Sequence, residues 1–159
     1  MENSVYIETT VVSYLCARTS RDIIIAARQQ ITERFWGLLG VYLVPYVSLL
    51  VINECSKGTP IQIQKRLKAI ERFDVVAIDL ESEALARNIV HEKGIPEQYP
   101  EDAMHIAAAA VNGIDFIATW NFAHINNPAT RKRIREIVER HDYVCPEICS
   151  PEELIGDAL

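Results

Sequence analysis

Residues 100–121 read PEDAMHIAAAAVNGIDFIATWN, and they carry the clearest structural pattern in the chain. The pattern predicts a helix over 101–112, whose four central alanines at 107–110 allow close packing against a sheet. Gly113 ends this helix, and the apolar run at 115–120 is typical of a buried strand. Asp102 then lies in the first turn of the helix, and Asn121 follows the strand.

The same alternation of short apolar runs and amphipathic helices extends over the rest of the chain. It predicts a single domain over 1–159 with an α/β fold of three layers, in which helices cover both faces of a central, mainly parallel sheet of about five strands. Expected helix starts include Thr9 or Thr10, Ser20, Ser48, and capping boxes at Thr59 and Ser150. The expected strands are 5–7, 41–47, 73–78, 115–120 and 143–145, and the expected longer helices are 60–72, 81–93, 101–112 and 128–141.

Composition excludes several classes of protein. Hydrophobic residues make up 49% and charged residues 24% of the 159 residues, which is ordinary for a globular protein and excludes a disordered or collagenous chain. The longest apolar stretch, 38–52, contains Pro45 and is shorter than the ~20 residues of a membrane-spanning helix. The N-terminus lacks the pattern of a signal peptide, so we expect a cytoplasmic protein without membrane contact.

The cysteines are consistent with that location. Cys16, Cys55, Cys145 and Cys149 form no CxxC pair. Together with His141, the last two could be read as an incomplete zinc site, but a fourth ligand is missing. Reduced, partly buried thiols are the favoured interpretation.

The charge balance is acidic, with one basic strip. A net charge of −6 argues against binding of nucleic acid by bulk positive charge. The cations between 131 and 140 can contact phosphates or form a solvated helix face. For phosphate contact the candidates are Arg21, Arg28, Arg131 and Arg133.

Four polar residues lie where a parallel sheet binds its ligands, beyond the carboxyl ends of strands. Glu8 follows the first strand, Glu54 lies on the helix after the second, Asp102 begins the alanine-rich helix, and Asn121 follows the fourth strand. Because apolar residues surround Glu54, an unpaired carboxylate there would be costly to bury. Three converging carboxylates repel one another, and oxygen ligands suit Mg²⁺ or Mn²⁺.

Each of the four also has an ordinary structural role open to it. Asp102 favours the helix dipole, Glu8 can face solvent, and Asn121 can form a turn. Glu54 can pair with Lys57 or Arg66.

Neighbouring residues have similar alternatives. Thr9, Thr10 and Thr119 can hold ligands or a water, or can serve as caps and strand formers. His105 can face the site or simply pack. Trp120 and His124 can stack on RNA bases, although Trp120 also fits the core. The first helices, with their wide isoleucine band at 23–25, are candidates for dimer contacts.

Four segments resemble the PIN domain, with VapC-type toxins of bacterial toxin–antitoxin systems as the most similar group. They are VYIETT at 5–10, VSLLVINE at 47–54, PEDAMHIAAAAVNGIDFIATWNFAHI at 100–125 and PEICSPEEL at 146–154. The resemblance implies a Mg²⁺- or Mn²⁺-dependent ribonuclease that leaves 5′-phosphate and 3′-hydroxyl ends. It implies metal binding by Glu8, Glu54 and Asp102, with Asn121 at a fourth position that is often acidic. It further implies a homodimer and a cognate antitoxin.

Two departures from the family pattern keep an alternative open. The first carboxylate is usually Asp and is Glu8 here, and Asn121 is neutral, so we expect weak binding of a second metal ion. A PIN-like domain that binds RNA or a partner without cutting is the second hypothesis. A receiver-like signalling domain ranks last, because it needs a Lys where 145–147 read CPE.

Overall fold

A sheet of five parallel strands forms the centre of the protein, whose structure, a computed structural model, describes residues 2–156. The order across the sheet is β3-β2-β1-β4-β5, so β1 is central. Each neighbouring pair is parallel, which confirms the predicted α/β class. The strands are β1 (Asn3–Ile7), β2 (Leu43–Ser48), β3 (Asp74–Val76), β4 (Phe116–Ala118) and β5 (Glu147–Cys149).

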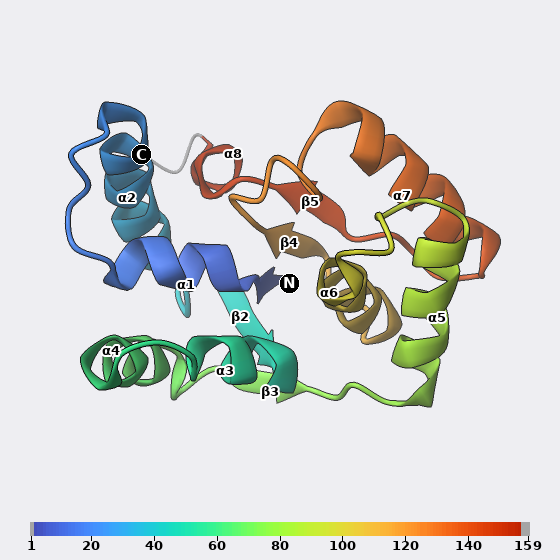
Figure 1. Cartoon of the computed structure of the whole chain (residues 1–159), viewed down its shortest axis with the longest axis horizontal. Helices are drawn as coiled ribbons and strands as arrows, with labels where there is room; N and C mark the ends of the chain where they lie inside the picture. The colour runs from blue at the N-terminus through green and yellow to red at the C-terminus, as the bar shows by residue number, and fades with distance from the viewer. Residues whose placement is uncertain (1, 157–159) are drawn as a thin grey trace.

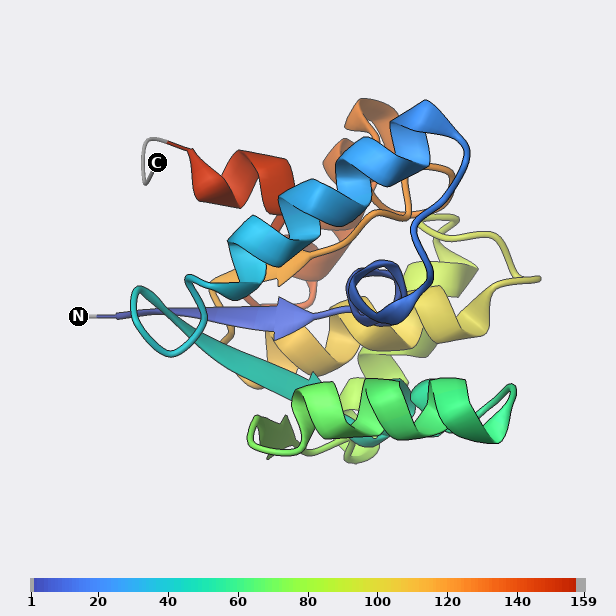
Figure 2. The same ribbon diagram turned by 90° about the vertical axis from the view of Figure 1, so that its left-hand side faces the viewer.

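Helices cover both faces of this sheet, giving the three predicted layers. In Figure 1, α1, α2 and α4 lie on one face and α5, α6 and α7 on the other. Figure 2 shows the chain passing from the carboxyl end of β1 directly into α1, with α8 beside α2. The helices are α1 (Thr9–Cys16), α2 (Ile23–Trp36), α3 (Leu49–Cys55), α4 (Pro60–Ile70), α5 (Leu80–His91), α6 (Pro100–Val111), α7 (Pro128–Arg140) and α8 (Pro151–Ile155).

The core lies between these layers. Val5, Tyr6 and Ile7 of β1 are fully buried, as expected for a strand covered on both faces. The alanines at 107–109 of α6 are also fully buried, so the small-residue helix is part of the core as its sequence predicts.

Some local predictions were wrong. The last strand is β5, not 143–145: Val144 is 86% exposed, whereas Ile148 and Cys149 pair with Ile117 and Ala118 of β4. Both sides of Pro146 carry short apolar runs, and only pairing with β4 selects between them.

Helix starts also differ in part. Glu8 rather than a threonine caps α1, Asp22 rather than Ser20 caps α2, and Thr59 makes no side-chain capping bond. The predicted Ser48 cap and the Ser150 capping box are present.

No helix within residues 2–156 is both long enough and apolar enough to cross a membrane. All four cysteines are free thiols. His141 does not join Cys145 and Cys149, because its Nε2 lies 2.6 Å from Glu92 Oε2. The incomplete zinc pattern therefore corresponds to a surface pair and two buried thiols.

Candidate acidic site

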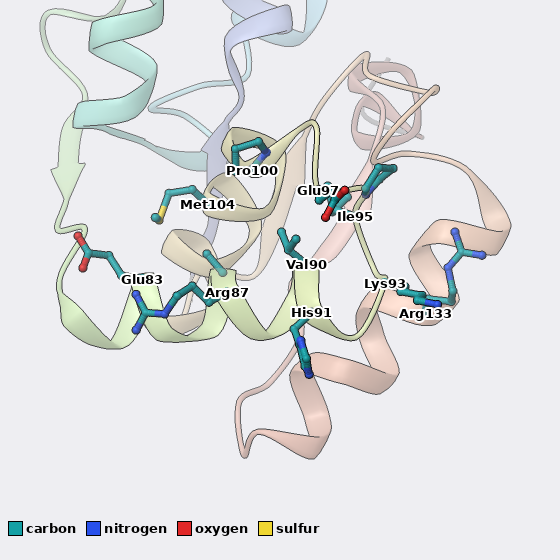
Figure 3. A pocket seen from close by; sticks show the side chains of 12 residues that line it. Glu83, Arg87, Val90, His91, Lys93, Ile95, Glu97, Pro100, Met104 and Arg133 are labelled. Atoms are coloured by element: carbon teal, nitrogen blue, oxygen red, sulfur yellow. The ribbon is translucent and has the colours of Figure 1, made fainter.

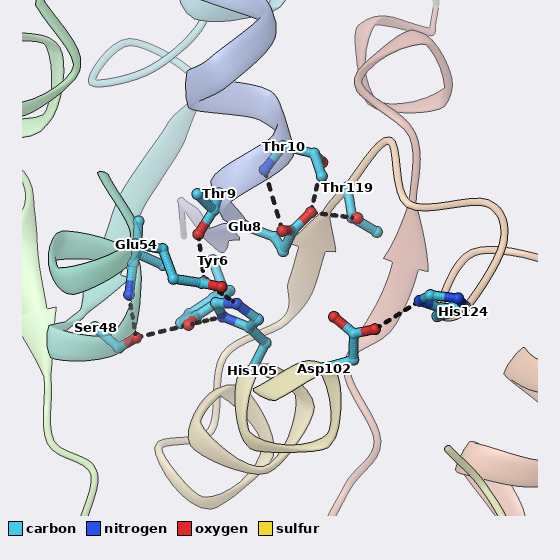
Figure 4. A network of polar contacts seen from close by, with 11 residues as sticks. Tyr6, Glu8, Thr9, Thr10, Ser48, Glu54, Asp102, His105, Thr119 and His124 are labelled. Atoms are coloured by element: carbon cyan, nitrogen blue, oxygen red, sulfur yellow. Dashed lines mark hydrogen bonds and ion pairs between the residues drawn. The ribbon is translucent and has the colours of Figure 1, made fainter. Parts of the chain in front are cut away.

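The carboxyl edge of the sheet carries Glu8, Glu54 and Asp102 on three separate elements. Glu8 links β1 to α1, and its backbone N–H donates to Ala118 O of β4 at 3.1 Å. Glu54 lies on α3 and Asp102 in the first turn of α6. Figure 4 shows the three side chains together, with Glu8 and Asp102 directed into the same region.

Threonine hydroxyls hold the Glu8 carboxylate. Glu8 is buried, and its Oε1 accepts hydrogen bonds from Thr119 Oγ1 at 2.6 Å and from Thr10 Oγ1. Its Oε2 accepts from the Thr10 N–H at 3.0 Å, which makes it the cap of α1. The solvent-facing alternative for Glu8 is therefore wrong, because these donors replace water around a buried charge.

A chain of buried hydrogen bonds leads to Glu54. His105 Nε2 lies 2.6 Å from Glu54 Oε1, and His105 Nδ1 lies 2.7 Å from the Tyr6 hydroxyl, which is 2.7 Å from Ser48 Oγ. Thr9 Oγ1 also donates to Glu54 Oε1 at 2.7 Å. The sequence offered Lys57 or Arg66 as the cation for Glu54, and the side chain that bonds it is His105 instead.

Arg66 is committed elsewhere, because its guanidinium donates to the backbone carbonyls of Cys55 and Lys57. Burial alone would raise the pKa of Glu54, but hydrogen bonds from His105 and Thr9 outweigh it and lower the pKa. Burial alone would lower the pKa of His105, but Glu54 and the neighbouring carboxylates raise it. The pair is therefore mutually stabilising.

Asp102 is held by the turn that follows β4. Its Oδ2 lies 3.0 Å from His124 Nδ1, and Asn121 Oδ1 accepts from the His124 backbone N–H at 3.0 Å. Burial raises the pKa of Asp102, although His105, His124 and Asn121 oppose the shift. Asn121 therefore forms the turn, as its ordinary role predicts, and also lies beside the acidic cluster.

The three carboxylates are suitable ligands for a hard cation and lie at one edge of the sheet, but their side chains are not arranged to coordinate one ion together. Within residues 2–156 no three His, Cys, Asp or Glu side chains are arranged to hold an ion. Glu8, Glu54 and Asp102 instead direct oxygens at Thr, His and backbone donors. The bonds of Glu54 are made by Oε1 and the bond of Asp102 to His124 by Oδ2, which leaves a second oxygen on each carboxylate for an ion, whereas both oxygens of Glu8 accept hydrogen bonds.

The structure distributes the candidate RNA-binding residues unevenly. Trp120 is buried, with its indole N–H donating to Thr32 Oγ1 at 2.9 Å, so it belongs to the core and presents no face to a base. His124 is partly exposed beside Asp102. Arg28 lies over the Phe122 ring at 4.9 Å from its centroid. Phe122 is partly exposed, and it was not among the residues predicted to contact RNA. Its position directly after Asn121 was the available signal.

The remaining cations lie on other elements. Arg21 is exposed just before the Asp22 cap of α2. Arg131 donates to Asn126 Oδ1 at 2.7 Å on α7. Arg133 borders a groove of about 980 Å³ between α5, α7 and the segment 93–100. Figure 3 shows Pro100 and Met104 of α6 facing this groove, and none of the three acids of the site lines it.

Comparison with known proteins supports the fold. No family model matches the chain, and no curated protein matches it. A chain in the crystal structure of VapBC2 from Rickettsia felis bound to a DNA fragment from their promoter is similar in three dimensions, with 16% identity and a TM-score of 0.58. The match covers 91% of this chain and 98% of that chain. The resemblance to VapC-type PIN domains is thus confirmed at the level of the fold, which is a PIN-like three-layer α/β/α arrangement.

Proposed function

We propose that this protein is a divalent-metal-dependent endoribonuclease and the toxin of a toxin–antitoxin pair. The observation that carries the proposal is that Glu8, Glu54 and Asp102, from three elements, lie around His105 at the same carboxyl edge of a PIN-like sheet. The similar chain comes from a structure of VapBC2, the assembly of a toxin with its antitoxin, which supports an antitoxin partner for this chain. We extend the proposal to a homodimer in the cytoplasm.

The chain's own residues have defined tasks in this proposal. Glu8, Glu54 and Asp102 would hold Mg²⁺ or Mn²⁺, and the Asn121 amide would orient the attacking water or complete the ligand set. The bound ion supplies Lewis-acid activation of that water and of a phosphoryl oxygen. Thr10 and Thr119 orient Glu8, while Thr9 and His105 orient Glu54.

Cleavage of a labelled RNA pool by the purified, antitoxin-free protein tests the proposal. We expect cutting with Mg²⁺ or Mn²⁺, none with EDTA, and none by Asp102→Asn. Asp74→Asn, which removes an exposed carboxylate at the start of β3, is the matched control and should cut normally. Equal cutting by Asp102→Asn would place the activity elsewhere or in a contaminant.

A second candidate is a PIN-like module that binds RNA or a partner without cutting. The engagement of all three carboxylates by protein donors favours it. RNA binding by folded protein without cleavage under either metal would support this candidate. Recovery of cleavage in the double variant Glu8→Asp, Asn121→Asp would then show that the two departures from the family pattern had silenced the site.

A further inference from the structure

Two partly exposed aromatic side chains border the acidic site, Tyr99 at the start of α6 and Phe122 on the turn after β4. Tyr99 occupies the position before the first residue of α6, and its ring lies 3.7 Å from that of His124, centroid to centroid, at an interplanar angle of 24°. His124 in turn contacts Asp102. Tyr99 remains 41% exposed, so one aromatic surface of the stack is open to a ligand.

Phe122 forms the second surface, on the side of the turn that faces α2. Phe122 is 37% exposed, and its ring packs edge-on against buried Trp120, with centroids 6.0 Å apart. The Arg28 guanidinium from α2 lies 4.9 Å from the Phe122 centroid, which adds a cation beside the ring. The turn thus carries Asn121 and Phe122 near its start, and its His124 ring joins it to Tyr99 at the start of α6.

Electrostatics makes such surfaces useful. The protein carries a net charge of −6, and three carboxylates gather at the site, so the local field opposes the approach of a phosphate backbone. Base stacking on aromatic rings does not depend on backbone charge and tolerates different base identities. It is available only to unpaired bases, because paired bases are already stacked in a duplex.

We propose that Tyr99, backed by His124, and Phe122, backed by Arg28, each stack against an unpaired base and seat single-stranded RNA across the acidic site. This inference rests on the proposed function for its ligand class, and it assigns the binding residues of that site. Duplex RNA offers these rings no free base face and should bind less tightly.

The test measures binding separately from cleavage. Tyr99→Leu and Phe122→Leu are each combined with Asp102→Asn, which keeps an oxygen for His124 but removes the charge. The probe is a 12-nucleotide fluorescein-labelled RNA, single-stranded or annealed to its complement, without added divalent metal. Fluorescence anisotropy gives Kd, and thermal melting checks that each variant is folded.

We expect the Asp102→Asn parent to bind the single strand more tightly than the duplex. Each Leu substitution should raise Kd for the single strand by roughly tenfold. The slope of log Kd against log salt should stay that of the parent, because no phosphate contact is lost. Tyr99→Phe and Phe122→Tyr keep an aromatic ring and should bind as the parent does, and a Leu variant that melts at the parent's temperature yet binds weakly has lost stacking rather than packing. Tyr42→Leu, an exposed tyrosine before β2 at the opposite edge of the sheet, is the matched control and should leave Kd unchanged.

The outcomes separate this inference from the proposed function. Leu variants that bind as tightly as the Tyr42→Leu control, or a parent that prefers duplex RNA, would overturn the inference even if the wild type cuts RNA. Loss of binding in both Leu variants, in a protein whose wild type never cuts, would support the stacking surfaces and refute the nuclease.

Discussion

The His105 imidazole has a hydrogen-bond partner at each ring nitrogen, and its protonation state sets the direction of the buried chain. Its Nε2 donates to Glu54 in either state, whereas Nδ1 accepts from the Tyr6 hydroxyl in the neutral ring and donates to the Tyr6 oxygen in the protonated ring. The Tyr6 hydroxyl shares its second hydrogen bond with Ser48 Oγ in both cases. A hydroxyl more than 50 residues away in sequence from His105 therefore helps to orient a carboxylate of the site.

Tyr6→Phe tests the weight of this chain. The substitution keeps the ring but leaves buried His105 Nδ1 without its hydrogen-bond partner, so we expect the free energy of unfolding to fall by about 1–3 kcal/mol. Urea denaturation measures it. Tyr42→Phe removes an exposed hydroxyl and should change nothing; an equally small effect at Tyr6 would mean that water replaces its hydroxyl.

Asp102 should make stability depend on pH. Its pKa is raised in the folded protein, chiefly by burial, so the folded state holds this proton to a higher pH than the unfolded chain does. Below the unfolded value of about 3.9 both states are protonated and no penalty exists. The penalty develops as pH rises from the unfolded pKa through the folded pKa, and it is complete above the folded pKa.

Asp102→Asn removes that penalty. We expect the variant to melt at a higher temperature than the wild type at pH 7, with the difference shrinking toward pH 3.5. Melting temperatures across this range measure the difference, and Asp74→Asn controls for the loss of one surface charge. A variant less stable at pH 7 would show that the hydrogen bond with His124 matters more than burial of the charge.

The location of the site residues was predictable from sequence, whereas their partners were not. Glu8 and Asn121 follow apolar runs that sequence identifies as strands, and the ends of parallel strands share one edge. The contacts from Tyr6 and Glu54 to His105 join residues far apart in the chain, and no local pattern encodes them. The burial of Trp120 likewise depends on Tyr14 and Thr32 from two other helices.

At the scale of elements, α5 and α7 approach each other closely at Gly94. A Cβ atom on Gly94 would lie 2.8 Å from Ile137 Cδ1 and 3.1 Å from the Ile89 carbonyl oxygen. Gly94→Ala should therefore lower the free energy of unfolding by roughly 1–3 kcal/mol, as overpacking usually does. Chemical denaturation measures the loss.

Ile137→Val supplies the control, because it deletes the Cδ1 atom that the new methyl group would meet. In a double-mutant cycle, the loss from Gly94→Ala should be smaller in the Ile137→Val background than in the wild type. Additive losses would locate the strain at the Ile89 carbonyl instead.

Element boundaries show the limit of local pattern. The alanine-rich helix was predictable because its composition, its Gly113 stop and the following strand all agree. The position of the last strand was not predictable, since two apolar runs of similar length flank Pro146. Only pairing with β4 selects β5 rather than 143–145. Similarly, the capping carboxylate of Glu8 was missed because the two adjacent threonines are better caps by residue type than Glu.

For the whole molecule, the topology explains why the site lies where it does. From β1 the chain continues to β2 and then β3 on one side of the sheet. It then crosses to β4, on the other side of β1, and continues to β5. The strand order therefore reverses between β1 and β4, and parallel sheets bind ligands at such a reversal. Glu8 and Asn121 follow these two strands, and α6, which carries Asp102, precedes the second of them.

Only the folded molecule assembles the acidic cluster, which predicts that a bound cation stabilises the fold. Glu8, Glu54 and Asp102 belong to three separate elements, so the unfolded chain offers no comparable site. An ion that binds only the folded state adds about 2.7 kcal/mol at a concentration ~100 times its Kd. For a chain of this size that corresponds to a rise in melting temperature of roughly 5–10 °C.

Thermal melts in EDTA, Mg²⁺ and Mn²⁺ measure this rise without any RNA. Asp102→Asn should lose most of it, whereas Asp74→Asn should keep it, because only the former removes a carboxylate from the cluster. Glu8→Asp tests whether the length of the Glu8 side chain matters for ion binding. The shorter Asp side chain must lose either the hydrogen bonds from Thr10 and Thr119 or its contact with the ion. An equal rise in Asp102→Asn would mean that the ion binds outside this cluster. No rise in the wild type would mean that the hydrogen bonds already made by the three carboxylates are stronger than their attraction for the ion.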